Sequence, residues 1–318
     1  MTVDNTPVVG RFAPTPSGFL HLGNVFCSLL AWLYAKSSGG KIVLRIEDLD
    51  PQRCSLAKAD ALARELEWLG LTWDEGAYCS ADSDSFFQSR RCDIYAHCFD
   101  LLQQQGLVYP CFCSRSELHA AEEPHASAGR IIYAAPCRKL TAAQRSAKMQ
   151  QRRPAWRIKV ADELIAFTDM HYGRQQANLA HECGDFILRR SDGVYAYQLA
   201  VVIDDALMGV NQVVRGCDLL SSTPVQLYLY RLLNLTPPSF CHIPLLTDAA
   251  GRRLSKRDGD LEIAALRQHF GSPEPIIGLL AYLAGQLPKP EPLTAAELLL
   301  LFRPEKIPLE NIVVPQLL

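Results

Sequence analysis

Apolar residues in the first 70 positions follow two different spacings. Residues 8–13 and 42–46 form short, nearly continuous apolar runs, which are typical of buried strands. Residues 23–35 and 56–69 carry apolar side chains three and four positions apart, which is the spacing of helices. Strand, helix, strand, helix in this order predicts an α/β fold with a parallel, doubly wound sheet.

A long helix is predicted at residues 86–105, and the segment after it differs in composition from the first part of the chain. Residues 109–168 carry cysteine pairs, scattered prolines and a basic cluster, so we interpret this stretch as an insertion into the α/β fold. The α/β pattern then resumes. Short apolar runs at residues 186–188, 201–203 and 213–214 predict strands, and they are followed by a predicted helix at 224–233 and a predicted strand at 243–246.

Helical spacing dominates the end of the chain, at residues 261–270, 275–287 and 293–302. We expect an α/β domain over residues 1–258, interrupted at 107–175 by the insertion, and a helical region over 259–318.

Composition narrows the class of protein. The chain has 318 residues, of which 48% are hydrophobic and 21% charged, as in ordinary globular proteins. It has no apolar run of about 18 residues and no secretory leader, which argues against a membrane or secreted protein. Its 11 cysteines form no disulfide framework, so we expect reduced thiols or a metal site, and a cytoplasmic location.

Charge is distributed unevenly, although the net charge is only −2. Residues 115–160 contain 10 basic and 3 acidic side chains. This segment is either a surface that binds phosphates or an ordinary solvated basic surface.

Residues 11–24, RFAPTPSGFLHLGN, join the first predicted strand to the first helix. Such a junction presents free backbone N–H groups and the positive end of a helix dipole, which suit phosphates. His21 adds a donor, and Gly23 permits close approach of a nucleotide. The alternative is a proline-stiffened loop that merely caps the helix.

A second candidate motif, RRLSKR, lies at residues 252–257 after a predicted strand and turn. A lysine-bearing loop there could cover a triphosphate and neutralise the charge on leaving pyrophosphate. The alternative is a solvated basic loop.

Five separated blocks together resemble the glutamyl branch of the class I aminoacyl-tRNA synthetases. Besides RRLSKR, they are RFAPTPSG at 11–18, RIEDLDP at 45–51, YQLAVVIDD at 197–205 and VRGCDL at 214–219. The resemblance spans roughly residues 8–260. It implies a Rossmann nucleotide-binding fold and an enzyme that activates glutamate with ATP.

The resemblance also implies residue roles. Arg11 and Arg215 would contact the two carboxylates of glutamate, because arginine binds carboxylates in a bidentate manner. Glu47 would bind the ammonium group of glutamate, and the Tyr197 hydroxyl would donate a hydrogen bond to the substrate. The backbone of Ala13 and the hydroxyl of Thr15 would complete this site. His21 and Lys256 would be catalytic, with Mg²⁺ on the phosphates. The expected ATP-binding residues are His21, Gly23, Asn24, Arg253, Ser255 and Lys256.

Only 61 residues follow Arg257, so we expect no anticodon-binding domain. This favours the truncated branch of the family, which activates glutamate without tRNA and transfers it to queuosine at the wobble position of tRNA(Asp). We expect a monomer that binds ATP, L-glutamate and this tRNA and no membrane. The alternatives are a short synthetase that charges the 3′ end of tRNA, and an inactive zinc-stabilised RNA-binding paralogue.

A metal site is predicted in the insertion. Cys111, Cys113, Tyr133 and Cys137 match a Cys-x-Cys…Tyr-x3-Cys zinc site of the truncated branch, and such a site would hold one structural Zn²⁺. On spacing alone, such cysteines are more often buried strand residues than zinc ligands. His119 or His125 could replace Tyr133 as the fourth ligand. The nearby candidates for tRNA backbone contacts are Arg138, Lys139, Arg145, Lys148, Arg152 and Arg153.

Overall fold

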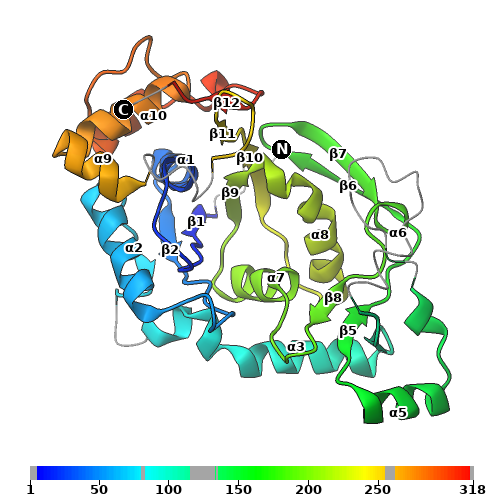
Figure 1. The fold of residues 1–318 in the computed structure, drawn as a ribbon. Coiled ribbons are helices and arrows are strands. Elements are labelled where there is room, and N and C mark those ends of the chain that lie inside the picture. Colours follow the sequence, from blue (N-terminus) through cyan, green and yellow to red (C-terminus); the bar gives the residue numbers. More distant parts are fainter. Residues whose placement is uncertain (1–5, 80–82, 115–132, 134, 255–261, 316–318) are drawn as a thin grey trace.

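A parallel sheet lies at the centre of the computed structural model, which describes residues 6–79, 83–114, 133, 135–254 and 262–315 (Figure 1). In it, β1 pairs with β2 and β2 with β3, while β9 pairs with β10, all in parallel. The two groups meet where the Asn211 backbone N–H donates to the Val9 carbonyl at 3.0 Å. The order across the sheet is therefore β3-β2-β1-β9-β10. The strands are Val9–Phe12 (β1), Lys41–Leu44 (β2), Glu75–Gly76 (β3), Gln212–Gly216 (β9) and Ser239–Ile243 (β10).

Helices cover both faces of this sheet and enclose two cores. On one face α1 (Leu22–Ser37) and α2 (Leu56–Trp68) pack with the three helices near the C-terminal end. On the other, α3 (Cys92–Gln104), α7 (Tyr197–Leu207) and α8 (Thr223–Leu232) form the second core. Because successive side chains of a strand face opposite ways, Val213 of β9 joins the second core and Val214 the first.

The helices near the C-terminal end share the core of α1. The Tyr34 ring of α1 packs edge-on against Phe302, with centroids 5.3 Å apart. These helices are α9 (Ile263–Phe270), α10 (Glu274–Leu283) and α11 (Ala295–Leu301).

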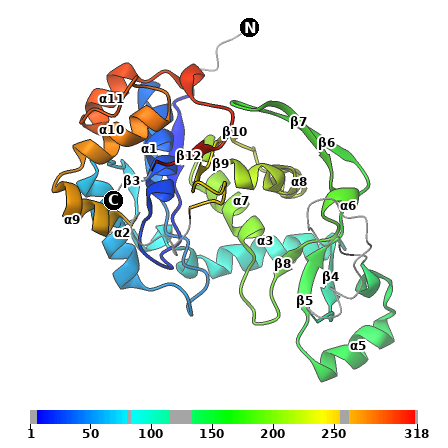
Figure 2. The ribbon, with the colours of Figure 1, turned by 45° about the horizontal axis from the view of Figure 1, so that its top comes forward.

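The insertion forms antiparallel structure at the far end of α3 (Figures 1 and 2). Strand β5 lies between β4 and β8 in one small sheet, and β6 and β7 form a hairpin that reaches back toward β10. Helix α5 lies at the outer corner. The elements are β4 (Val108–Cys111), η3 (Pro136–Lys139), α5 (Ala142–Gln151), β5 (Ala155–Ile158), β6 (Leu164–Asp169), β7 (Gly173–Asn178), α6 (Leu179–Glu182) and β8 (Ile187–Arg189).

The last described residues, 304–315, form a segment that we call the C-terminal strap. It contains η6 (Pro304–Lys306) and β12 (Ile312–Val313), and β12 pairs in parallel with β11 (Leu246–Thr247). The strap also reaches the turn of the β6–β7 hairpin, where His171 and Tyr172 bond the carbonyls of Pro308 and Leu309 at 3.0 and 2.9 Å. The strap thus touches both the sheet end and the insertion.

Most predicted elements are confirmed, but some predicted boundaries are wrong. The helix predicted at 86–105 begins only at Cys92. The backbone of Ile46 hydrogen-bonds to the Phe86 carbonyl and to the Gln88 N–H, and these bonds hold residues 86–88 in an extended bridge beside the strands. Short 3-10 turns, Ser83–Phe86 (η1) and Gln88–Arg90 (η2), flank that contact. The single strand predicted at 243–246 is wrong, because β10 ends at Ile243 and a separate strand, β11, begins at Leu246.

Two predicted strands belong to other structures. Residues 201–203 are β-branched, yet they lie in helix α7, whose residues 199–205 are all buried between its neighbours, so tertiary burial overrides their strand propensity. Residues 186–188 overlap strand β8, which pairs antiparallel with β5 in the insertion and not in the parallel sheet. Among the described residues, no helix has the length and apolarity to cross a membrane.

Candidate active site

A cavity of about 540 Å³ opens at the carboxyl ends of β1 and β9 and at the N-terminus of α1. This is the point where the strand order reverses, which is where open α/β sheets bind ligands. Ten of the predicted site residues line it: Arg11, Ala13, Thr15, His21, Gly23, Asn24, Glu47, Tyr197, Arg215 and Arg253. Ser255 and Lys256 lie outside the described residues.

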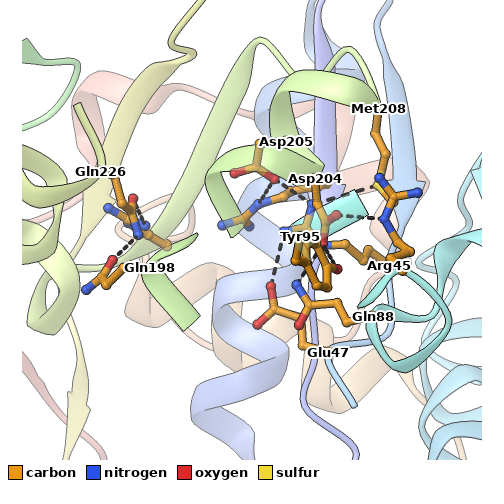
Figure 3. Close-up of polar contacts among 12 residues, drawn as sticks. Arg45, Glu47, Gln88, Tyr95, Gln198, Asp204, Asp205, Met208 and Gln226 are labelled. Atoms are coloured by element: carbon orange, nitrogen blue, oxygen red, sulfur yellow. Dashed lines mark hydrogen bonds and ion pairs between the residues drawn. The ribbon is translucent and has the colours of Figure 1, made fainter. Parts of the chain in front are cut away.

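Arg11 and Glu47 are held by one buried network of charges (Figure 3). The Asp205 carboxylate of α7 accepts from Arg11 Nε at 3.1 Å and from Arg45 Nη1 at 2.6 Å. Arg45 Nη2 donates to Glu47 Oε1 at 3.1 Å. The Arg45 side chain is fully buried and does not line the cavity. It therefore holds Glu47 and Asp205 in place from behind.

Asp204 anchors the same network from the other side. It accepts from Arg91 Nε at 2.7 Å, and its side chain is fully buried. It also accepts from Gln88 and from Tyr95, both at 2.8 Å (Figure 3). Because a buried charge without its partner costs several kcal/mol, such a network fixes its members' positions. Helix α7 thus supplies both acidic supports.

Arg215, at the end of β9, is held mainly by uncharged groups. Its Nε donates to His242 Nε2 at 3.0 Å, Nη1 to Gln226 Oε1 at 2.8 Å and Nη2 to Thr223 Oγ1 at 2.9 Å. Burial lowers the pKa of Arg215, which nevertheless remains a cation. Arg215 is thus a buried positive charge that also lines the cavity.

Burial also shifts the two other groups expected to contact glutamate. It raises the pKa of Glu47, although the nearby guanidinium groups of Arg45 and Arg11 oppose the rise. It raises the pKa of Tyr197, which therefore stays a hydroxyl donor near neutral pH. The cavity can offer two fixed cations, one carboxylate and one phenol to a small zwitterion.

The predicted ATP-binding residues His21, Gly23 and Asn24 lie at the start of α1. The His21 backbone N–H donates to Asn24 Oδ1 at 3.3 Å. A Cβ on Gly23 would approach the His21 ring to 3.2 Å, so glycine leaves room for the imidazole. The Glu262 backbone forms an isolated antiparallel bridge with that of His21, and the Arg253 side chain forms an ion pair with Asp218, which also lines the cavity. Leu254, the last described residue before 255–261, lines the cavity, and Glu262, the first one after that range, lies beside His21.

The three predicted cysteine ligands lie together in the insertion. The Sγ atoms of Cys111, Cys113 and Cys137 lie within 4.8 Å of one another, and Cys113 and Cys137 are 3.6 Å apart. Tyr133 Oη lies 3.2 Å from Cys111 Sγ and 3.8 Å from Cys113 Sγ. Tetrahedral zinc with Zn–S bonds of about 2.3 Å places sulfurs about 3.8 Å apart, so the cluster fits such an ion. His119 and His125 lie outside the described residues.

The cluster's electrostatics also suit a cation. Burial opposes ionisation of Cys111, but hydrogen bonds from Tyr133 and Arg157 hold the pKa of its thiol below the ordinary value. Burial and the neighbouring Cys111 raise the pKa of Cys113 to about 12. The cluster can bind a metal ion, which would offset the repulsion between neighbouring thiolates. All eleven cysteines are described and none forms a disulfide.

Sequence reasoning missed several supporting residues. Arg45, Asp204 and Asp205 stand inside the matching blocks, so those blocks could have indicated them. His242, Thr223 and Gln226 hold Arg215 from outside any block. No local signal marks these three residues, because their role depends on β10 and α8 meeting at β9.

These features define a nucleotide-binding α/β fold with a site for a small charged substrate. The chain belongs to the family described as tRNA synthetases class I (E and Q), catalytic domain, which it matches over residues 7–295, and it is an aminoacyl-tRNA synthetase-like ligase.

Particular relatives narrow the resemblance further. The chain is 47% identical to the glutamyl-Q tRNA(Asp) synthetase of Nitratidesulfovibrio vulgaris, covering 96% of this chain and 95% of that protein. It is 46% identical to that of Symbiobacterium thermophilum, with the same coverage. A glutamate tRNA ligase from Elizabethkingia meningosepticum, solved in complex with its amino acid, superposes with a TM-score of 0.81 at 28% identity, covering 96% of this chain and 67% of that one.

Proposed function

We propose that this enzyme activates L-glutamate with ATP, without tRNA, and transfers it to queuosine at the wobble position of tRNA(Asp). The main support is the meeting of Arg11, Arg215 and Glu47 in one cavity beside the N-terminus of α1. The similarity to glutamyl-Q tRNA(Asp) synthetases supports the choice of acceptor.

The proposed amino-acid site matches the charges of glutamate. Arg11 and Arg215 would each receive a carboxylate, and arginine suits that role because it donates two parallel hydrogen bonds. Glu47 would receive the ammonium group, and the Tyr197 hydroxyl would add a hydrogen bond. The backbone at Ala13 and the Thr15 hydroxyl would complete the site. Glutamine would lose the ionic contact of its side chain with one of the two arginines.

Activation requires positioning and charge stabilisation more than a nucleophile of the protein. The glutamate α-carboxylate would attack the α-phosphorus of ATP, the bond to the bridging oxygen would break, and pyrophosphate would leave. His21 and Lys256 would stabilise the transferring phosphate, with Gly23, Asn24, Arg253 and Ser255 binding ATP. Magnesium would arrive on the phosphates as part of the substrate. Loss of one such donor costs about 10²–10³ in rate.

The second step would form an ester. A queuosine hydroxyl would attack the carbonyl carbon of the adenylate, AMP would leave, and the hydroxyl proton would pass to AMP or water. We place the tRNA backbone near η3 and α5, where Arg138, Lys139 and Lys148 are exposed. A zinc ion on Cys111, Cys113, Cys137 and Tyr133 would hold the η3 region to β4 without taking part in the chemistry.

Glutamate-dependent exchange of ATP with pyrophosphate, measured without tRNA, tests activation. Labelled glutamate offered to tRNA(Asp) with and without queuosine, and to tRNA(Glu), tests transfer. Removing the 3′-terminal adenosine should leave labelling of queuosine-containing tRNA(Asp) intact. Lys256→Ala should lower exchange about 10²–10³-fold.

Two outcomes would overturn this proposal. Labelling of tRNA(Glu) that needs its terminal adenosine would identify a short synthetase that charges the 3′ end. Binding of tRNA without any glutamate-dependent exchange would identify an inactive RNA-binding paralogue.

A further inference from the structure

Arg215 is connected to the insertion through a line of buried side chains. His242 Nδ1 lies 2.6 Å from Asp169 Oδ2, and the side chains of both residues are fully buried. His242 belongs to β10 of the parallel sheet, whereas Asp169 is the last residue of β6 in the insertion. We call Asp169, His242 and Arg215 the Asp169–His242–Arg215 line.

The donors and acceptors along this line fix the state of the imidazole. Arg215 Nε can only donate, so His242 Nε2, 3.0 Å away, must accept and carries no proton. The remaining ring proton is then on Nδ1 and is donated to Asp169. Burial lowers the pKa of His242 and the cation of Arg215 adds to that effect, while Asp169 opposes it; the net lowering agrees with a neutral ring.

Asp169 is itself held firmly. Its carboxylate accepts from the backbone N–H groups of His171 at 3.0 Å, Tyr172 at 2.9 Å and His242 at 3.1 Å. These bonds and the His242 ring hold the pKa of Asp169 below its ordinary value against the effect of burial. The acceptor that sets the His242 tautomer is therefore rigid and ionised.

We propose that Asp169 is a positioning residue for the amino-acid substrate, which acts through His242 to orient the Arg215 guanidinium toward the cavity. The proposal rests on the proposed function, in which Arg215 receives a glutamate carboxylate. Three acceptors, His242, Gln226 and Thr223, each take one N–H of the guanidinium. The guanidinium also interacts with the cavity residue Tyr197 and the Leu219 carbonyl at 3.5 Å, and it lies over the Phe240 ring, 5.1 Å from the centroid.

Without the Asp169 carboxylate, the imidazole could carry its proton on Nε2. That proton would face the N–H of Arg215 Nε, and two donors cannot bond each other. The guanidinium would turn away from the position that the carboxylate needs, and glutamate binding would weaken while ATP binding would not.

Three variants test the line: Asp169→Asn, His242→Asn and the double variant. In Asp169→Asn, an amide N–H can face Nδ1 of the His242 ring, which permits the tautomer with the proton on Nε2. His242→Asn leaves an amide toward Asp169 and removes the acceptor from Arg215. Each should raise the KM for glutamate in ATP–pyrophosphate exchange about 10–100-fold and change the KM for ATP less than threefold.

The double variant should raise the KM for glutamate no further than either single variant does, because each single substitution already breaks the Asp169–His242–Arg215 line. Asp162→Asn is the matched control, since Asp162 precedes the same hairpin but its side chain is 70% exposed. It should leave both KM values unchanged. Calorimetric titration with glutamate alone, and thermal unfolding, separate substrate binding from folding.

An unchanged glutamate KM in Asp169→Asn, or additive effects in the double variant, would overturn the inference. So would equal rises in the KM for ATP and for glutamate, which indicate a general structural role. If Asp169→Asn does not fold, His242→Asn carries the test alone and must raise the glutamate KM. If the wild type itself shows no glutamate-dependent exchange, the proposed function fails instead.

Discussion

Residues at the proposed amino-acid end of the cavity are held by partners that do not line the cavity. Arg45 does not line the cavity, yet its guanidinium holds both Glu47 and Asp205. Asp205 in turn holds Arg11. Replacing Arg45 would remove the ion-pair partner of Glu47, and replacing Asp205 would remove that of Arg11, so these buried residues depend on one another.

Glu47 gives this site a predicted pH dependence. Burial raises its pKa above the usual value, against the effect of Arg45 and Arg11, with the carboxylate of Asp205 nearby. Its ionised form would bind the ammonium group, so kcat/KM for glutamate should fall as pH drops through this raised pKa. The fall should begin at a higher pH than an exposed glutamate would give. Exchange rates measured between pH 5 and 8 check this.

Glu47→Gln is the control for that profile. It should lower kcat/KM near neutral pH, and the acidic fall that remains should be only that of the substrate and of ATP. An identical profile in the wild type and in Glu47→Gln would show that another group titrates.

Among the elements of the insertion, η3 and β4 meet at the cysteine cluster, where we propose a zinc ion. Cys137 precedes α5 in the chain, and the backbone N–H of Phe112 donates to its sulfur at 3.3 Å. Removing the metal with a chelator, or replacing Cys137 by Ser, should lower tRNA transfer more than tenfold and leave exchange within about twofold. Metal content by mass spectrometry should fall from one ion per chain to none.

Cys98→Ser is a suitable comparison, because Cys98 lies on α3 outside the cluster. It should keep the metal and the transfer activity. Equal loss of both half-reactions on chelation would contradict a role confined to the insertion.

The basic residues of α5 and the segment after it should make transfer sensitive to salt. Lys148, Arg152 and Arg153 are exposed at this end of the insertion. Because phosphate contacts release counterions, raising salt from 50 to 200 mM should weaken transfer much more than exchange. Replacing all three by Ala should reduce the slope of that dependence.

The distant Lys289, whose side chain is 72% exposed, offers a matched control. Lys289→Ala should leave the slope unchanged. Equal salt sensitivity of exchange and transfer would contradict tRNA binding at α5.

At the scale of the whole molecule, the C-terminal strap links the nucleotide end to the insertion. Asn311 Oδ1 accepts from the backbone of Leu245 at 2.9 Å and from Cys217 Sγ at 3.4 Å. Leu245 lines the cavity, and β11 follows directly. The strap therefore supports the segment that leads to Arg253.

Asn311→Ala should raise the KM for ATP about three- to tenfold and lower the free energy of unfolding by about 1 kcal/mol. The KM for glutamate should change less, because the strap contacts the nucleotide end. Exchange kinetics and denaturant unfolding measure these effects. Glu310→Ala, at an exposed neighbour, should change neither, and a selective rise in the glutamate KM would contradict this role of the strap.

The sequence by itself determined the alternation of strands and helices, the blocks that carry Arg11, Glu47, Tyr197 and Arg215, and the cysteine spacing. These features are local: each is written in residues that are neighbours in the chain. Their periodicity and spacing can be read from the sequence without knowledge of the fold.

Only the tertiary structure decided which distant groups support the site. Asp169, Thr223 and His242 lie in three separate elements, and no pattern in the sequence relates them. The helix at residues 201–203 was also decided at this level, because burial on every side outweighs the strand preference of valine and isoleucine. Contacts between remote segments depend on how the layers pack, and that information is not contained in any short stretch of the chain.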